Sequence, residues 1–157
     1  MSQDRYLALL RAHARRHPDH ADVVQAQAVV IDGRRISLWF EPAGPDADPD
    51  DGQLLCRTDV ARFPGGPSNA VCRLLLQANN LWAGTHGATL GLRGQDTVML
   101  SAARRIGSLT PATLDALLAS LQVDALTWAA QLTRPAGAIR TDADPGLLHP
   151  VSYTHLR

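Results

Sequence analysis

LLLQANNL, at residues 74–81, runs through Trp82 and Ala83 into GTHGATLGL, at residues 84–92. The first segment continues a helical pattern that begins at Ser68, a residue type that often caps helices. The residues of the predicted helix form two neighbouring stripes along its surface. The first stripe contains Val71, Leu74, Ala78 and Leu81, and the second contains Cys72, Leu75, Leu76 and Asn79. A helix that is apolar over most of its circumference must be covered on more than one side.

The second stripe predicts how the chain assembles. In a domain this small, one sheet covers one side of the helix, and closed two-fold dimers are the commonest oligomers. We therefore expect the other side to pack on the same helix of a second copy. The expected homodimer interface consists of Cys72, Leu75, Leu76, Asn79 and Trp82. The alternative is that another helix of the same chain covers this side.

The remaining elements follow from apolar periodicity and turn residues. In chain order we expect a helix from Ser2 to Pro18, strands at Val23–Ile31, Ile36–Phe40 and Leu54–Val60, the helix from Ser68, strands at Ala88–Leu92 and Thr97–Ala102, and a helix from Thr110 to about Leu132. Two hairpin turns, at Asp32-Gly33 and around Gly94-Gln95-Asp96, join neighbouring strands. The order α-β-β-β-α-β-β-α predicts an α+β fold with a mostly antiparallel sheet.

Length and composition indicate one domain without a membrane span. The chain has 157 residues, a mass of 16.9 kDa and a formal net charge of zero, with Arg as the sole cationic type besides His. Without a basic surplus we expect no nucleic-acid partner, and without a long apolar run we expect a cytoplasmic protein. Residues 1–134 form the predicted domain, and the Pro- and Gly-containing residues 135–157 a mobile tail. Cys56 and Cys72 are expected as free thiols.

Strand Ile36–Phe40 has a clear alternation. Ile36, Leu38 and Phe40 should face the core, which leaves Trp39 on the opposite face. A large aromatic side chain in that position is either covered by another element or marks a binding surface.

No motif predicts a cofactor, a metal or catalysis. His13 and His17 are one helical turn apart, but the cationic Arg15 and Arg16 lie between them. His20 follows the helix-breaking Pro18, and no carboxylate or thiol has convincing ligand spacing. We therefore expect a solvated helix end and no metal site. Asp46, Asp48 and Asp50 resemble the start of a calcium loop, but Asp51 and Arg57 stand where that loop needs Gly and Glu.

The glycines from Gly84 onward follow a helix, whereas phosphate-binding loops precede one, and the chain has no Lys to meet a phosphate. Ser101, His86 and Asp96 lack the context that activates a nucleophile. We therefore expect no nucleotide binding and no enzymatic activity.

The segment from Leu74 to Leu92, with its leucine-rich helix, its Asn and its ATLGL strand, resembles the Tir chaperone-like (CesT-type) family of type III secretion chaperones. The resemblance extends over about residues 3–132, with residues 42–51 as an insertion. It implies a homodimer built on the middle helix and an adjacent strand. It also implies that the protein binds the N-terminal segment of secreted effectors and keeps it unfolded for the export apparatus and its secretion ATPase.

On this resemblance, Leu7, Leu10 and Trp39 are expected near the effector path. An Arg-only composition, typical of a high-GC genome, favours a multi-effector role. Two alternatives stay open: a small α+β enzyme or ligand-binding domain with a pocket on the sheet, and an adaptor that binds a folded partner.

Overall fold

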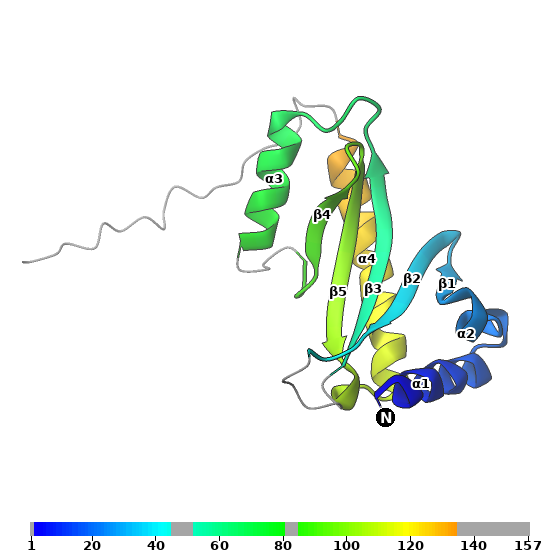
Figure 1. Ribbon diagram of the computed structural model, residues 1–157. Coiled ribbons are helices and arrows are strands. Elements are labelled where there is room, and N and C mark those ends of the chain that lie inside the picture. Colours follow the sequence, from blue (N-terminus) through cyan, green and yellow to red (C-terminus); the bar gives the residue numbers. More distant parts are fainter. Residues whose placement is uncertain (1, 45–51, 81–84, 135–157) are drawn as a thin grey trace, which may run out of the picture.

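The computed structural model describes residues 2–44, 52–80 and 85–134 (Figure 1). The elements are α1 (Ser2–Arg16), η1 (Pro18–His20), α2 (Val23–Ala26), β1 (Ala28–Ile31), β2 (Arg34–Glu41), β3 (Gln53–Arg62), α3 (Asn69–Asn79), β4 (Thr89–Arg93), β5 (Thr97–Arg105), η3 (Ile106–Ser108) and α4 (Pro111–Leu132). Trp82, the acidic residues Asp46, Asp48 and Asp50, and residues 135–157 lie outside the described residues. None of the described helices is both long and apolar enough to cross a bilayer.

The five strands form one antiparallel sheet in the order β1-β2-β3-β5-β4. This arrangement confirms the predicted α+β fold. The β1–β2 hairpin turns at Asp32 and Gly33, whose φ angles of 49° and 77° fit a tight turn of this kind.

One part of the sequence prediction was wrong. Residues Val23–Ala26 form a helical turn, in which the amides of Gln25 and Ala26 donate to the carbonyl of Asp22 at 2.9 and 2.8 Å. Gln27 then takes a left-handed conformation, with φ of 44°, and the strand begins at Ala28. Val23 is fully buried, so packing outweighs the strand preference of this β-branched residue.

One face of the sheet carries the core. Ile36, Leu38, Leu54, Cys56 and Leu100 are all fully buried. Helix α4 packs along β3 and β5, and lies behind them in Figure 1. Helix α1 closes the same face at β2, where Tyr6 stacks on Phe40 with ring centroids 5.8 Å apart and donates its hydroxyl to the carbonyl of Leu38.

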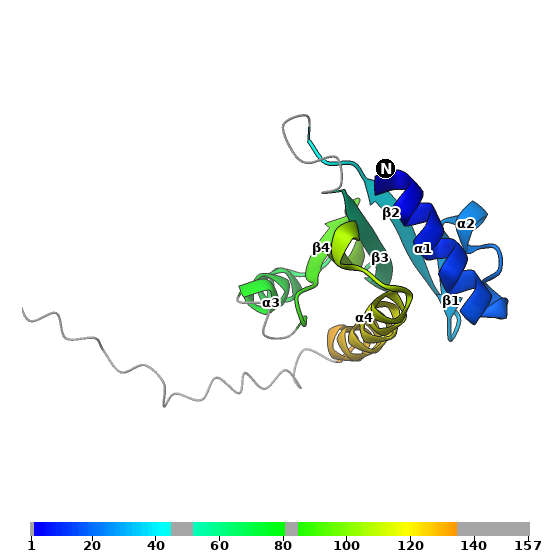
Figure 2. The ribbon, with the colours of Figure 1, turned by 90° about the horizontal axis from the view of Figure 1, so that it is seen from below.

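Helix α3 lies at the margin of this core, to which it contributes one buried side chain, Leu75. Figure 2 shows α3 at one end of the molecule and α1 with α2 at the other. Its main contacts are with the edge strand β4. The outer face of β3 and β5, toward the viewer in Figure 1, carries none of the described helices.

Candidate functional site

A pocket of about 690 Å³ lies where β2 separates from β3. The two strands pair from Glu41 and Gln53 as far as Ile36 and Thr58, and beyond these residues β2 continues into its hairpin with β1. The pocket is lined by Asp32, Gly33, Arg34, Arg35, Ser37, Trp39, Arg57, Thr58, Asp59, Arg93, Met99 and Leu126. It therefore draws on the hairpin, the outer face of the sheet and one side chain of α4.

Trp39 lies on the outer face, as its alternation with Ile36 and Leu38 predicts. Ile36 and Leu38 are fully buried, whereas Trp39 is half-buried. The guanidinium of Arg57 on β3 stacks over the Trp39 ring, 4.3 Å from its centroid. This contact places a cation over the indole and gives a mixed apolar and cationic surface.

The charges that line the pocket are mainly positive. Arg93 pairs with Asp59, and the Arg34 guanidinium donates to the main-chain carbonyl of Asp59. Arg57 makes no ion pair with any residue in the described part of the chain. A carboxylate of a bound peptide could therefore reach Arg57 without displacing an acidic side chain of the protein.

Helix α3 divides the predicted dimer residues between two sides. Leu75 is 6% exposed and packs into the core, whereas Leu76 is 71% exposed. The Asn79 amide donates to the carbonyl of Leu90 at 2.8 Å and accepts from its amide at 2.9 Å, so it pairs with β4 as a further strand would. Cys72, four residues before Leu76, is half-buried. Leu76 and Cys72 are thus accessible to a second chain on the outward side of α3, whereas Leu75 and Asn79 make contacts within the protomer.

The expected effector residues do not come together in the structure. Leu10 of α1 is fully buried, and Leu7 is half-buried against the core. Both belong to the covered side of β2, while Trp39 lies on the other side. Because its side chain has no exposed surface, Leu10 cannot contribute to a binding face. Both leucines instead pack α1 against the core.

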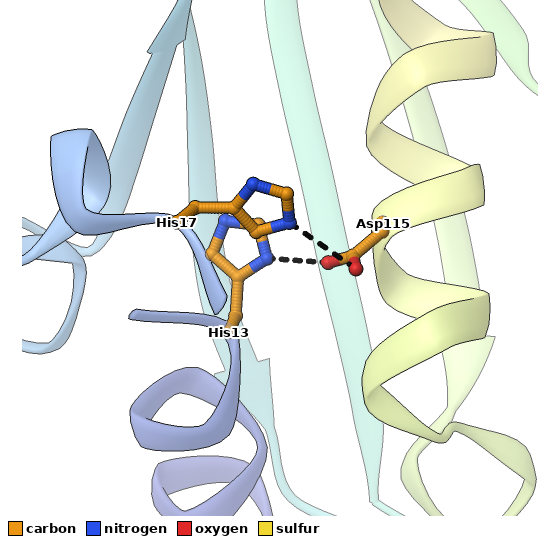
Figure 3. Close-up of side chains that lie close together, drawn as sticks. All are labelled: His13, His17 and Asp115. Carbon is orange, nitrogen blue, oxygen red and sulfur yellow. Dashed lines mark hydrogen bonds and ion pairs between the residues drawn. The ribbon is translucent and has the colours of Figure 1, made fainter. Parts of the chain in front are cut away.

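The end of α1 is not the solvated helix end expected from its sequence. His13 is 2% exposed, and its Nδ1 lies 2.7 Å from Oδ1 of Asp115 on α4. Figure 3 shows the rings of His13 and His17 directed at this carboxylate. Ligand atoms of the three residues all lie within 4.8 Å of one another, which makes them a candidate metal site. Sequence spacing could not identify it, because the carboxylate comes from the other end of the domain.

Burial and charge set the pKa values in this cluster. Burial lowers the pKa of His13, and the nearby Asp115 carboxylate opposes only part of that effect. Burial alone would raise the pKa of Asp115, but the interactions with His13 and His17 outweigh it, so the carboxyl pKa is lowered. A neutral His13 imidazole thus faces an ionised Asp115 carboxylate near neutral pH.

Comparison with known proteins gives two positive findings. The model of the Tir chaperone protein (CesT) family matches residues 35–129, more than half of the chain. The solved structure of the ExsC–ExsE complex contains a chain with 21% sequence identity and a TM-score of 0.53, over 67% of this chain and 74% of that one. At this identity the second likeness concerns the fold alone. No curated protein is significantly similar in sequence.

Proposed function

The chain belongs to the Tir chaperone protein (CesT) family, and on this premise we propose that it is a type III secretion chaperone that binds effector proteins and catalyses no reaction. The observation that carries the proposal is the outer face of the sheet, which none of the described helices covers, with its Trp39–Arg57 pocket.

The pocket suits an extended peptide with both apolar and acidic side chains. Trp39, Met99 and Leu126 supply apolar surface, and Arg57 supplies a cation without an acidic partner. A chain held along the outer face by such side-chain contacts cannot form its own compact core. We infer that the N-terminal segment of an effector is kept unfolded in this way, in the cytoplasm, until the export apparatus and its ATPase take it.

The proposed active form is a homodimer built on α3. Leu76 and, on the adjacent strand β4, Leu92 are large apolar residues that are 71% and 42% exposed in the protomer. Helix α3 has its inner side fixed by Leu75 and Asn79, so its outer side can pack on a second copy without a change of fold. Cys72 and Leu76 form the proposed centre of this interface; Trp82, which the sequence also assigns to it, lies outside the described residues.

Effector capture tests this function. The full chain, expressed with an affinity tag in a host that has a type III system, should retain one or more secreted proteins that mass spectrometry identifies. Trp39→Ala should weaken this binding by about 2 kcal/mol, roughly 30-fold, as truncation of a buried aromatic anchor does. The control is Val123→Ala, because Val123 is 61% exposed on α4 and does not line the pocket.

Three outcomes would count against this proposal. Recovery of no secreted protein with the wild-type chain would contradict the chaperone proposal. Equal loss of effector in the Val123→Ala variant would show that the pocket is not the binding surface. Calorimetry with magnesium and ATP should show no binding, and saturable binding there would favour an enzyme instead.

A further inference from the structure

Three histidines and a carboxylate meet where the end of α1 reaches α4. His13 lies in the last turn of α1, His17 directly follows that helix, and Asp115 lies in the second turn of α4. Nδ1 of His13 is 2.7 Å from Oδ1 of Asp115, and Nε2 of His17 is 3.2 Å from Oδ2 (Figure 3). His20, from the turn that follows, stacks on His13.

His17 has an unsatisfied nitrogen at this point. Its Nε2 atom is buried and has no hydrogen-bond partner among the described residues, since its approach to Asp115 lacks the angles of a hydrogen bond. Leaving a buried nitrogen unpaired is unfavourable. At 3.2 Å, this nitrogen and the Asp115 oxygen have about the separation of two ligands on one tetrahedral metal ion.

The donor atoms fit a small divalent ion. Two imidazole nitrogens and a carboxylate oxygen are a typical ligand set for Zn²⁺, with bonds of about 2.0–2.2 Å. In a tetrahedron with such bonds the donors lie about 3.3 Å apart. The ligand atoms of His13, His17 and Asp115 already lie within 4.8 Å of one another. Small side-chain rotations, which move these atoms by about 1 Å or less, would bring them to the separations of a tetrahedral site.

We propose that His13 Nδ1, His17 Nε2 and one oxygen of Asp115 bind a zinc ion, with water as the fourth ligand. The ion joins the end of α1 to α4 and fixes the N-terminal helix on the domain. Neither cysteine takes part: Cys56 lies in the sheet and Cys72 in α3, both away from this cluster.

His20 completes the site from behind. Nε2 of His13 lies 2.9 Å from Nδ1 of His20, and Nε2 of His20 lies 3.3 Å from the carbonyl oxygen of Val30. With zinc on His13 Nδ1, the remaining proton of His13 sits on Nε2 and is donated to His20, which in turn donates to Val30. Every ring nitrogen of His13 and His20 then has a partner. Such outer hydrogen bonds fix the tautomer and orientation of a ligating histidine.

Arg16 is the competing cation. Its Nε lies 3.0 Å from Oδ2 of Asp115, and its side chain is 52% exposed. Arg16 neutralises the carboxylate when no metal is bound, and it can turn toward solvent when zinc takes that role. Removal of this arginine should therefore strengthen zinc binding, whereas it would weaken a cluster held together by ion pairs alone.

Calorimetry with zinc chloride on the full, tag-free chain tests the site, after treatment with a chelator. We expect saturable binding of one ion per chain and a rise in melting temperature. Asp115→Asn and His17→Gln should abolish the saturable binding, and His20→Phe should weaken it about 10- to 100-fold. Arg16→Gln should tighten it. Circular dichroism confirms that each variant is folded; His17 and Asp115 are both partly exposed, so their exchange is tolerated more easily than that of His13.

The matched control is His86→Gln. His86 also pairs with an aspartate, Asp124, at 2.9 Å, but this pair provides only two ligands. The variant should bind zinc as the wild type does. Absence of saturable binding, binding that survives Asp115→Asn, or an equal loss in His86→Gln would each overturn the proposal. Cobalt provides an independent readout: the weak spectrum of six-coordinate cobalt, in place of the strong bands of a four-coordinate site, would also overturn it.

Discussion

Helices α3 and α4 are both rich in leucine, yet the protomer uses them differently. Helix α4 buries side chains along its whole length, from Leu114 to Leu132, against the sheet and α1. In α3, by contrast, Leu75 is the one buried residue. Leu118 of α4 is 1% exposed and Leu76 of α3 is 71% exposed. Most of the apolar surface of α4 thus belongs to the core. Helix α3 buries Leu75 and packs other apolar side chains partly against the core, but it leaves Leu76 available to another chain.

The difference follows from where each helix meets the sheet. Helix α4 crosses the covered face at the central strands β3 and β5. Helix α3 lies beside the edge strand β4 and is held there by the Asn79 amide and by Leu75. A helix beside an edge has one side covered by its own chain. Leucine content alone therefore does not distinguish a core helix from an interface helix; position in the sheet does.

The same substitution in the two helices gives the largest contrast. Leu118→Ala should lower the free energy of unfolding by about 2–5 kcal/mol, because it leaves a cavity in the core. Leu76→Ala should change the stability of the protomer by no more than about 0.5 kcal/mol, as expected of a surface site. Urea unfolding at several protein concentrations measures both. Equal costs for the two variants at low concentration would contradict the comparison.

Removal of the Asn79 side chain should have an intermediate, local effect. Asn79→Ala leaves the amide and carbonyl of Leu90 without their partners, at a cost of about 1–3 kcal/mol. Hydrogen exchange should become faster in α3 and β4 and stay unchanged in α4. The exposed neighbour Asn80 supplies the control, and Asn80→Ala should leave exchange in α3 as it is. Faster exchange throughout α4 would mean that α3 stabilises α4 as well as β4, and would contradict the comparison.

Thiol labelling of the two cysteines compares the core with helix α3 in the wild-type protein, without any substitution. Burial raises the pKa of Cys56, in the sheet, to about 12. At pH 8 this thiol is almost fully protonated and should not react with a thiol reagent until the chain unfolds. Cys72, on α3, is half-buried and should react in the folded protein, more slowly at high protein concentration, where the proposed dimer covers it. Rapid labelling of Cys56 in the folded state would contradict its place in the core.

Local patterns predicted much of the fold. The alternation of Ile36, Leu38 and Trp39 predicted the faces of β2, and Asp32-Gly33 predicted its turn. The helix expected from Thr110 is present as α4, and the Thr110 hydroxyl caps it by accepting from the amide of Thr113. Where tertiary packing decides, as at Val23, the prediction was wrong.

The candidate sites were less accessible to prediction for physical reasons. Leu75 and Leu76 are adjacent on a helix that is apolar on both sides, so the sequence does not show which of them faces β4. Leu10 has the spacing of an amphipathic helix whether its partner is the core or an effector. The contact of His13 with Asp115 joins residues 102 positions apart, and no local pattern indicates it.

The native mass of the complex purified from the host tests the central claim most directly. The account predicts two copies of this chain, about 34 kDa from a chain mass of 16.9 kDa, bound to one effector. Leu76→Asp should separate the copies, because it would bury an unpaired charge in the α3 interface. A single chain without a secreted partner, or a dimer that Leu76→Asp leaves intact, would contradict the account.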